Sequence, residues 1–332
     1  MAILVRIASY RDPELRPTLR DCLAKARWPG DLRFALCWQH DATERLDDHA
    51  GDRRFRIIDV PYAESRGMGW ARSRCATLYQ GEEFTLSLDS HHRFIEHWDA
   101  LLIGMMAETG ADRPILTSYP PAYDPADESR RETWPNSIEF GHFNGNGTIT
   151  RMPVAMTEPA ALAAPVRARF YAGGFAFSVG RLLEDGPPDP TIYFLGEEES
   201  LAVRAFTHGY DLFHPHRIVC WHEYHRKGKP KHWEDHDTPE QPASHWHALE
   251  QRGLARVRQV LGVDPEEPSA PLGVHGRGSR RTLQDYQLYA GLHHRLQGVQ
   301  DYTLQRRSPP NPNPYRSEAQ WLRSLRYAGP GR

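Results

Sequence analysis

Short apolar runs alternate with amphipathic stretches along residues 1–118, and this alternation sets the expected fold. The apolar runs predict buried β-strands at residues 3–8, 32–38, 55–60, 84–88 and 115–118. Helical periodicity between them predicts α-helices at residues 13–25, 67–79 and 97–109. Strands and helices that alternate in this way are typical of a doubly wound α/β fold. We therefore predict a Rossmann-like, mostly parallel central sheet flanked by helices.

The pattern changes in the second part of the chain. Residues 119–169 are rich in Pro, Asn, Gly and aromatic residues and predict long loops with short strands. Such a segment is either a substrate-side or lid element or an insertion without a role. The later predicted elements are strands at 170–178, 210–215 and 217–221 and helices at 197–207, 243–261 and 282–297. An Asp-, Glu- and Pro-rich stretch then separates a main domain, residues 1–263, from a C-terminal extension, residues 264–332, with a short helix and a Pro/Asn-rich tail.

Composition narrows the possible classes of protein. The chain has 332 residues, 25% of them charged, and a formal net charge of −2, which argues against a dominant electrostatic grip on nucleic acid or on an anionic membrane. No window approaches 18 consecutive apolar residues and the N-terminal run lacks a basic segment, so neither a membrane span nor a signal peptide is expected. The four cysteines have no C-x-x-C spacing and fit a reducing compartment. We expect a cytoplasmic enzyme or binding protein.

The strand at 84–88 ends in Asp89-Ser90-His91, which is the strongest chemical signal in the chain. Ligands of open α/β sheets bind at the carboxyl ends of the strands. Across this turn a carboxylate and an imidazole can face one cation, and Mn²⁺ or Zn²⁺ suits both ligands. The alternative is an Asp that caps the next helix beside a surface His. His92 diverges from His91 and is expected behind the ligands.

His222 follows an apolar strand and is the most economical third ligand, although a strand-end His is often structural. The sequence His222-Glu-Tyr-His225 also suggests a zinc hydrolase. However, that motif requires histidines four positions apart on one helical face, and these are three apart. A hydrolase is therefore the least favoured interpretation.

Three further features suggest a ligand site, each with a structural alternative. Arg66, Gly67 and Arg72 surround a helix start, where backbone N–H groups and positive charge suit phosphates. Gly173 and Gly174 interrupt a strand, which indicates the close approach of a ligand or backbone, or else a bulge. The acids at 197–199 exceed what a helix N-terminus requires, although the helix dipole alone favours them there.

Motifs along residues 1–300 occur together in one order and resemble a known family. They are ILVRIASYRD at 3–12, GMGWAR at 67–72, DSHHRF at 89–94, WD at 98–99, YAGGFAFS at 171–178, LGEEESLAVR at 195–204, GYDLFHP at 209–215, VCWHEYH at 219–225 and GSRRTLQDYQLYAGL at 278–292. Together they resemble the glycosyltransferases that modify hydroxyproline, the Skp1-type polypeptide N-acetylglucosaminyltransferases. More distantly, they resemble polypeptide N-acetylgalactosaminyltransferases.

The resemblance implies a GT-A fold for residues 1–263, a UDP-sugar donor and a divalent metal, Mn²⁺ or Mg²⁺, with 119–169 on the acceptor side. It assigns the metal to Asp89, His91 and His222, and the catalytic carboxylates to Glu197 and Glu198. It assigns the donor to Ala8, Ser9, Tyr10, Arg11, Arg72, Gly173 and Gly174. To this donor set we add Arg66 and Gly67 at the helix start and Ser90 in the Asp-Ser-His turn. Two departures from the distant relatives are Phe194 in place of Trp and Glu198 in place of an amide, and the added carboxylate leaves the donor sugar open.

The sequence therefore predicts a metal-dependent, retaining glycosyltransferase that moves a sugar, GlcNAc first, from a UDP-sugar to a hydroxyl group of a polypeptide. A glycan, a small molecule or a hydroxymethylated base of nucleic acid are alternative acceptors, although the near-neutral charge weakens the last. A non-catalytic module that binds nucleotide sugars or glycans is the other alternative, and it would tolerate a broken metal triad.

Overall fold

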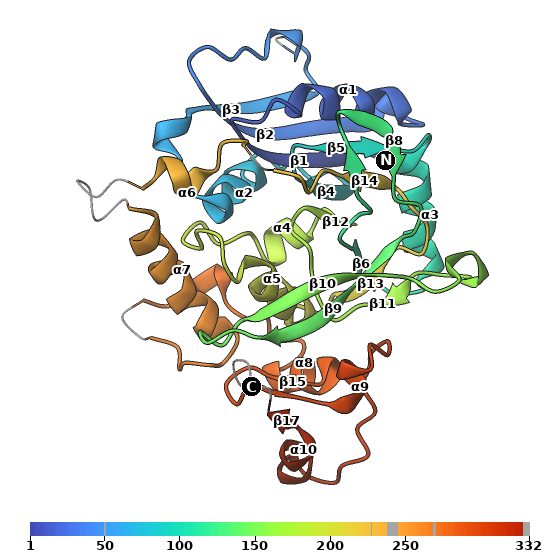
Figure 1. The fold of residues 1–332 in the computed structure, drawn as a ribbon, viewed down its shortest axis with the longest axis vertical. Coiled ribbons are helices and arrows are strands. Elements are labelled where there is room, and N and C mark those ends of the chain that lie inside the picture. Colours follow the sequence, from blue (N-terminus) through green and yellow to red (C-terminus); the bar gives the residue numbers. More distant parts are fainter. Residues whose placement is uncertain (50, 227, 238–244, 268–269, 328–332) are drawn as a thin grey trace.

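The computed structural model describes residues 1–49, 51–226, 228–237, 245–267 and 270–327. Within them, one eight-stranded sheet forms the centre of the molecule (Figure 1). Its strands, in spatial order, are β11 (Val166–Arg167), β13 (Asp211–His214), β6 (Pro114–Thr117), β12 (Phe175–Val179), β4 (Phe84–Leu88), β1 (Ile3–Tyr10), β2 (Leu32–His40) and β3 (Phe55–Pro61). Strands β1 to β4 run parallel to one another, as do β6 and β13, so the predicted α/β class is confirmed.

Strand β12 runs antiparallel to both of its neighbours, β4 and β6. Its first residue, Phe175, pairs with Leu88, the last residue of β4. The chain that enters β12 therefore meets the chain that leaves β4. The prediction of one strand over 170–178 was wrong at its start, because Gly173 and Gly174 form a turn before β12.

Helices cover both faces of the sheet. They are α1 (Leu15–Lys25), α2 (Met68–Ala76), α3 (Trp98–Glu108), α4 (Leu182–Asp185), α5 (Glu197–Thr207), α6 (His232–Asp235), α7 (Trp246–Val260), α8 (Leu283–Ala290), α9 (Asp301–Leu304) and α10 (Glu318–Ser324). Alternate side chains of β1 point to opposite faces: Val5 packs with α1 and α3, whereas Leu4 packs with α2 and α4. This two-sided burial explains why the strands read as continuous apolar runs. Residues 243–244 of the predicted helix at 243–261 lie outside the described residues.

Small sheets complete the fold. They are β5 (His92–Phe94) with β14 (Cys220–His222), β7 (Tyr123–Asp124) with β8 (Asp127–Arg131), β9 (Asn136–Phe143) with β10 (Ile149–Ala155), and β15 (Leu292–His293) with β16 (Gly298–Val299) and β17 (Arg326–Tyr327). Residues 119–169, expected to be long loops with short strands, contain the β9–β10 hairpin, whose strands have 8 and 7 residues. Its residues Ile138, Phe140, Phe143 and Ile149 are buried in the largest hydrophobic cluster, so this part of the segment is core. A lid or acceptor role for the segment stays a prediction.

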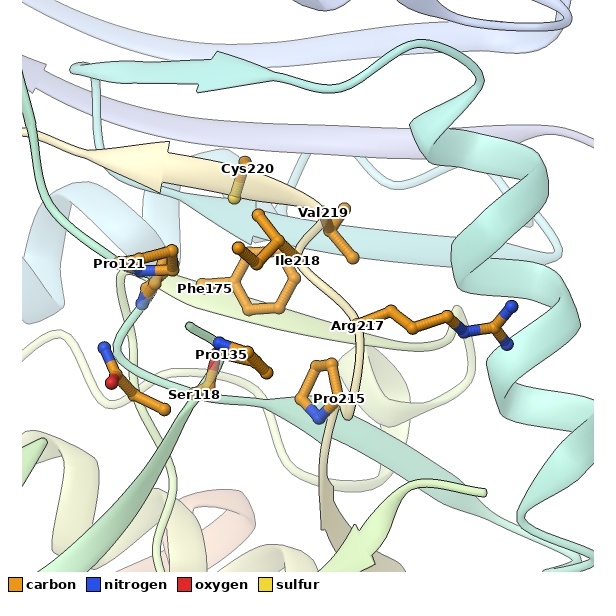
Figure 2. A pocket seen from close by; sticks show the side chains of 11 residues that line it. Ser118, Pro121, Pro135, Phe175, Pro215, Arg217, Ile218, Val219 and Cys220 are labelled. Carbon is orange, nitrogen blue, oxygen red and sulfur yellow. The ribbon is translucent and has the colours of Figure 1, made fainter. Parts of the chain in front are cut away.

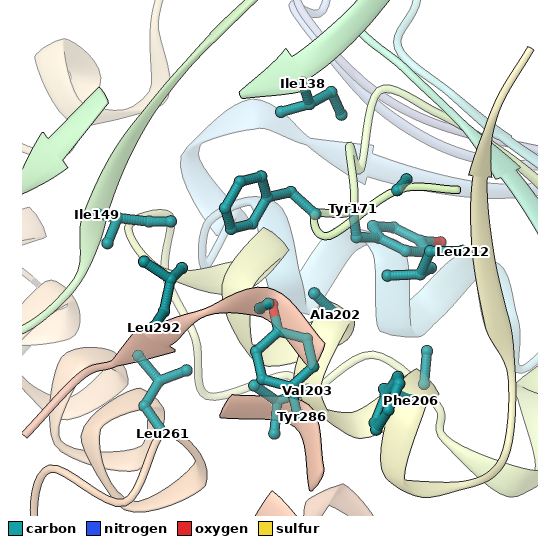
Figure 3. Close-up of a cluster of buried hydrophobic side chains, with 14 of the residues drawn as sticks. Ile138, Ile149, Tyr171, Ala202, Val203, Phe206, Leu212, Leu261, Tyr286 and Leu292 are labelled. Carbon is teal, nitrogen blue, oxygen red and sulfur yellow. The ribbon is translucent and has the colours of Figure 1, made fainter. Parts of the chain in front are cut away.

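The same cluster joins the C-terminal region to the main domain. Tyr286 and Leu292 pack against α5 and α7 through Val203 and Leu261 (Figure 3). Residues 283–299 thus share their core with α5, although α10 lies at the far end of the molecule from β3 (Figure 1). The predicted boundary at residue 263 stays a prediction, and residues 268–269 and 328–332 of the extension lie outside the described part.

A buried carboxylate fixes the start of helix α3. Asp99, in the first turn of α3, is fully buried, and its two oxygens accept the N–H groups of Arg27 at 2.7 Å and Trp28 at 2.9 Å. We expect Asp99→Ala to lower the free energy of unfolding by about 2–4 kcal/mol, because two buried donors lose a charged acceptor.

Urea unfolding followed by circular dichroism measures this loss. The control is Asp112→Ala, whose side chain is 94% exposed and which should change the free energy of unfolding by less than about 0.5 kcal/mol. Equal stability of the two variants would contradict the assigned role of Asp99.

Candidate functional site

Three side chains, carried by residues in or next to strands of two different sheets, converge at the carboxyl end of β4. Asp89 follows β4, His91 precedes β5, and His222 ends β14, whose register places it opposite His92. One ligand atom from each of Asp89, His91 and His222 lies within 4.8 Å of the others. Two ligands of one cation, each about 2.0–2.6 Å from it, lie no more than about 5 Å apart. The three predicted ligands therefore fit one divalent cation, and no other such group occurs in the described ranges.

The hydrogen bonds of the histidines agree with this fit. Nδ1 of His91 lies 2.7 Å from Oδ2 of Asp12, and an ionised carboxylate can only accept. Nδ1 therefore carries the proton, and Nε2 of His91 keeps its lone pair for a ligand. Nε2 of His222 lies 3.3 Å from Oδ2 of Asp89. His92 is fully buried behind the group, with Nδ1 3.1 Å from the carbonyl oxygen of Asp89, and His225 is exposed and is not part of the group.

A buried guanidinium holds Asp89 from the other side. Arg72, on α2, donates from Nη2 to Oδ1 of Asp89 at 3.0 Å and forms an ion pair with Glu197 at the start of α5. Burial opposes ionisation of Asp89, but the hydrogen bond from His222 and the charge on Arg72 outweigh it and lower its pKa well below the usual range. Burial raises the pKa of Glu197, while Arg72 opposes that rise.

The paired glycines allow this contact. A Cβ atom on Gly173 would lie 1.9 Å from Nη1 of Arg72, and one on Gly174 would lie 2.5 Å from Oδ2 of Asp89. Both distances are far below van der Waals contact. The predicted close approach therefore exists, and within the described residues its partners are side chains of the protein itself. The turn is fixed further by Asp89, whose N–H donates to the carbonyl oxygen of Gly174 at 3.2 Å.

Glu198 is held by the β9–β10 hairpin. Its Oε1 accepts the N–H of Gly173 at 2.7 Å, and its Oε2 accepts from the Tyr119 hydroxyl at 2.7 Å and from Arg151 Nη2 at 2.8 Å. Arg151 also forms an ion pair with Glu199. An arginine of β10 thus offsets part of the negative charge of Glu198 and Glu199.

The last residues of β1 and the loop that follows it lie beside the site. Ala8, Ser9 and Tyr10 end β1 beside the carboxyl end of β4, since Ile7 pairs with Leu88. The Tyr10 hydroxyl donates to Oδ2 of Asp235 on α6 at 2.7 Å. Arg11, which has a positive φ of 45°, donates to the same atom at 2.9 Å. Residues of α6 therefore contact the loop predicted to hold the nucleotide.

Three further predicted donor residues, Arg66, Gly67 and Ser90, have different surroundings. Arg66 is exposed and lies 6.0 Å from the Trp70 ring. Gly67 has a φ of 98°, and a Cβ atom there would lie 2.4 Å from the ring of Tyr193, so packing alone accounts for this glycine. Ser90 is buried, and its hydroxyl donates to Asp12 at 2.6 Å. The donor roles of these residues stay predictions, as do those of the whole set.

The structure adds residues that sequence reasoning missed. Asp12, Arg151 and Tyr119 contact predicted site residues through buried or partly buried hydrogen bonds. Asp12 had a signal, since it stands two residues after the end of β1. Arg151 had none, because an arginine on a β-hairpin usually faces solvent.

A small cavity lies beside β14 (Figure 2). Its lining is largely proline and apolar side chains, and includes Pro121, Pro135, Phe175, Pro215 and Val219. It contains no carboxylate or histidine, so it contributes no ligand to the cation group.

Within the described ranges, no helix has the length and apolar character needed to cross a bilayer.

Two solved structures resemble this chain at low sequence identity. GalNAc-T7, in a crystal structure with UDP, GalNAc and Mn²⁺, is 15% identical with a TM-score of 0.59, over 78% of this chain and 48% of that one. The chain spans about half the length of the GalNAc-T7 chain that it matches. The TarS 1–349 fragment of S. aureus, in complex with UDP-GlcNAc, is 11% identical with a TM-score of 0.42, over 78% of this chain and 73% of that one.

The GalNAc-T7 likeness confirms the GT-A fold. No curated protein sequence matches the chain. The family model for glycosyltransferases (GlcNAc), however, matches residues 2–53 and 47–296, which is most of the chain. The chain belongs to this family and is a glycosyltransferase.

Proposed function

We propose that this glycosyltransferase moves GlcNAc from UDP-GlcNAc to a hydroxyl group of a polypeptide, with a divalent cation held by Asp89, His91 and His222. The observation that carries the proposal is the convergence of these three ligand atoms at the carboxyl end of β4. The presence of UDP, GalNAc and Mn²⁺ in the GalNAc-T7 structure supports a UDP-sugar and Mn²⁺. The Skp1-type motifs support hydroxyproline as the acceptor group.

Each group of residues has a distinct part in this proposal. A bound Mn²⁺ or Mg²⁺ would offset the charge of the diphosphate leaving group. The loop Ala8–Arg11 binds the uridine, and Arg72 adds positive charge beside the diphosphate. Glu197 is buried and paired with Arg72, so it orients a sugar hydroxyl or the acceptor. Glu198 holds the Gly173 turn that lines the sugar.

The central experiment measures UDP release from UDP-GlcNAc, UDP-GalNAc and UDP-glucose, with Mn²⁺ and with EDTA, in the presence of a hydroxyproline peptide, a proline peptide or a glycan. We expect release with UDP-GlcNAc that needs both the cation and the hydroxyproline. Release that needs a glycan instead would overturn the proposed polypeptide acceptor.

The four cysteines are buried and free, which supports a cytoplasmic location, and cell fractionation tests it.

The metal ligands give the first prediction of this function. Asp89→Asn removes a charged ligand. Loss of a residue that only hydrogen-bonds to a metal ligand typically lowers activity about 10- to 100-fold. Loss of the ligand Asp89 itself should therefore lower Mn²⁺-dependent transfer by more than that. Rates of UDP release at saturating donor measure the effect, and circular dichroism checks the fold.

The matched control is Asp21→Asn. Asp21 accepts the N–H of Phe94 on β5 at 2.6 Å and lies outside the metal group. Its substitution should leave Mn²⁺ dependence unchanged. Full activity of Asp89→Asn, or of the wild-type protein in EDTA, would show that no cation is needed at this position.

Arg72 gives the second prediction. Loss of a charge-assisted contact to phosphate costs on the order of 1.5–3 kcal/mol, so Arg72→Ala should weaken UDP binding about 10- to 100-fold. Isothermal titration calorimetry with UDP measures this. Arg72 also pairs with Asp89 and Glu197, so Arg72→Lys, which keeps one positive charge, should lose less affinity.

Arg74→Ala is the control for this series, because Arg74 is exposed on the same helix. It should bind UDP as the wild-type protein does. If folded Arg72→Ala also binds UDP with unchanged affinity, the diphosphate lies elsewhere and Arg72 serves only the buried carboxylates.

The stereochemistry of the product gives the third prediction. The family resemblance implies retention, so an α-linked donor should yield an α-glycoside. In the proposed reaction the bond from the anomeric carbon to the phosphate breaks and the bond to the acceptor oxygen forms on the same face, while the departing phosphate takes the acceptor proton. The ion pair of Glu197 with Arg72 stabilises the carboxylate charge that a nucleophile would spend.

We therefore expect Glu197→Gln to lower the rate without any glycosyl-enzyme in intact-mass spectra. The anomeric proton of the product, observed by NMR, decides the main point. A β-linked product from the α-linked donor would refute retention, and a covalent adduct in the wild-type protein that Glu197→Gln abolishes would refute the same-face route.

A further inference from the structure

Asp12 lies behind the metal ligands and has both carboxylate oxygens in use. It follows β1, and its side chain is 1% exposed. Oδ2 lies 2.7 Å from Nδ1 of His91 and accepts the Ser90 hydroxyl at 2.6 Å, while Oδ1 accepts the backbone N–H of Glu14 at 3.0 Å. Because these contacts come from two separate segments, they fix the carboxylate in position and in rotation.

An arginine compensates for this buried charge. Nη1 of Arg226 lies 3.1 Å from Oδ2 of Asp12, and Arg226 stands four residues after His222. The hydrogen bond with His91 and the ion pair with Arg226 together offset the cost of burying this carboxylate. One carboxylate thus contacts the Ser90–His91 turn, the loop after β1, and the segment that carries the third ligand.

We propose that Asp12 is a positioning residue for the cation, because it locks His91 with the proton on Nδ1 and with Nε2 toward Asp89 and His222. This inference rests on the proposed cation site. A carboxylate behind a histidine ligand fixes the tautomer and ring orientation and makes the ligand nitrogen more basic. A role in helix capping alone would use only the oxygen that faces Glu14. The second oxygen, which faces His91 and Ser90, requires another explanation.

The test replaces Asp12 with a side chain of the same shape that has one acceptor oxygen. In Asp12→Asn, one side of the group carries an NH₂ that cannot accept from His91. We expect the dissociation constant for Mn²⁺ alone, measured by electron paramagnetic resonance of the free ion and repeated with UDP, to rise about 10- to 100-fold. Circular dichroism and thermal unfolding verify that the variant is folded.

A matched control separates positioning from stability. Asp99 is another fully buried aspartate whose two oxygens accept backbone N–H groups, but it is not part of the metal group. Asp99→Asn should lower stability and leave Mn²⁺ affinity unchanged. A variant that restores the charge, Asp12→Glu, should recover part of the Mn²⁺ affinity lost in Asp12→Asn.

A second measurement needs neither metal nor activity. Long-range ¹H–¹⁵N NMR spectra of the metal-free protein report which nitrogen of His91 carries the proton. We expect Nδ1–H in the wild-type protein and a change of tautomer in Asp12→Asn. An Nε2–H tautomer in the wild-type protein would overturn the inference, and this readout remains available if Asp12→Asn does not fold.

The outcomes distinguish the two proposals. If Asp89→Asn loses Mn²⁺ and folded Asp12→Asn binds it as the wild-type protein does, the positioning role is wrong and the cation site stands. If neither substitution changes Mn²⁺ affinity, the cation site is wrong and the inference falls with it.

Discussion

The site depends on one buried guanidinium that lies between two carboxylates. Arg72 joins Asp89, at the end of β4, to Glu197, at the start of α5. Removing one member of a buried ion pair typically costs about 3–5 kcal/mol, because the other charge is left uncompensated. The contact also requires the antiparallel placement of β12, which brings Gly173 and Gly174 to the end of β4 without side chains in the way. Topology, glycines and charge therefore constrain one another.

This arrangement explains how a cation group can be assembled from distant parts of the chain. Asp89 is fixed by Arg72 on one side, and His91 is fixed by Asp12 on the other. His222 is the last residue of β14. The register of β14 against β5 places His222 opposite His92, next to the other two ligands. None of the three ligands depends on an exposed side chain for its orientation. A group whose side chains are already held in place in this way would need little ordering to bind the proposed cation.

The sequence predicted what local pattern controls and missed what distant contacts control. Strand 84–88 and the turn at Asp89 were predictable because an apolar run ends in polar residues. The β9–β10 hairpin was missed because its Asn/Gly turn at 144–147 and its polar outer face indicate a loop. The contact of Asp12 with His91 spans 79 positions and that of Arg151 with Glu198 spans 47. Neither has a periodicity that a single sequence reveals.

The departure at Glu198 has a physical explanation in the same contacts. An unpaired carboxylate at position 198 would add an uncompensated negative charge beside Glu197. Arg151 and Tyr119 occupy Oε2, and the Gly173 N–H occupies Oε1. Glu198 therefore has both oxygens occupied, although Arg151 divides its single positive charge between Glu198 and Glu199. Its partner Arg151 comes from the hairpin, so the charge at 198 and the arginine at 151 form one unit.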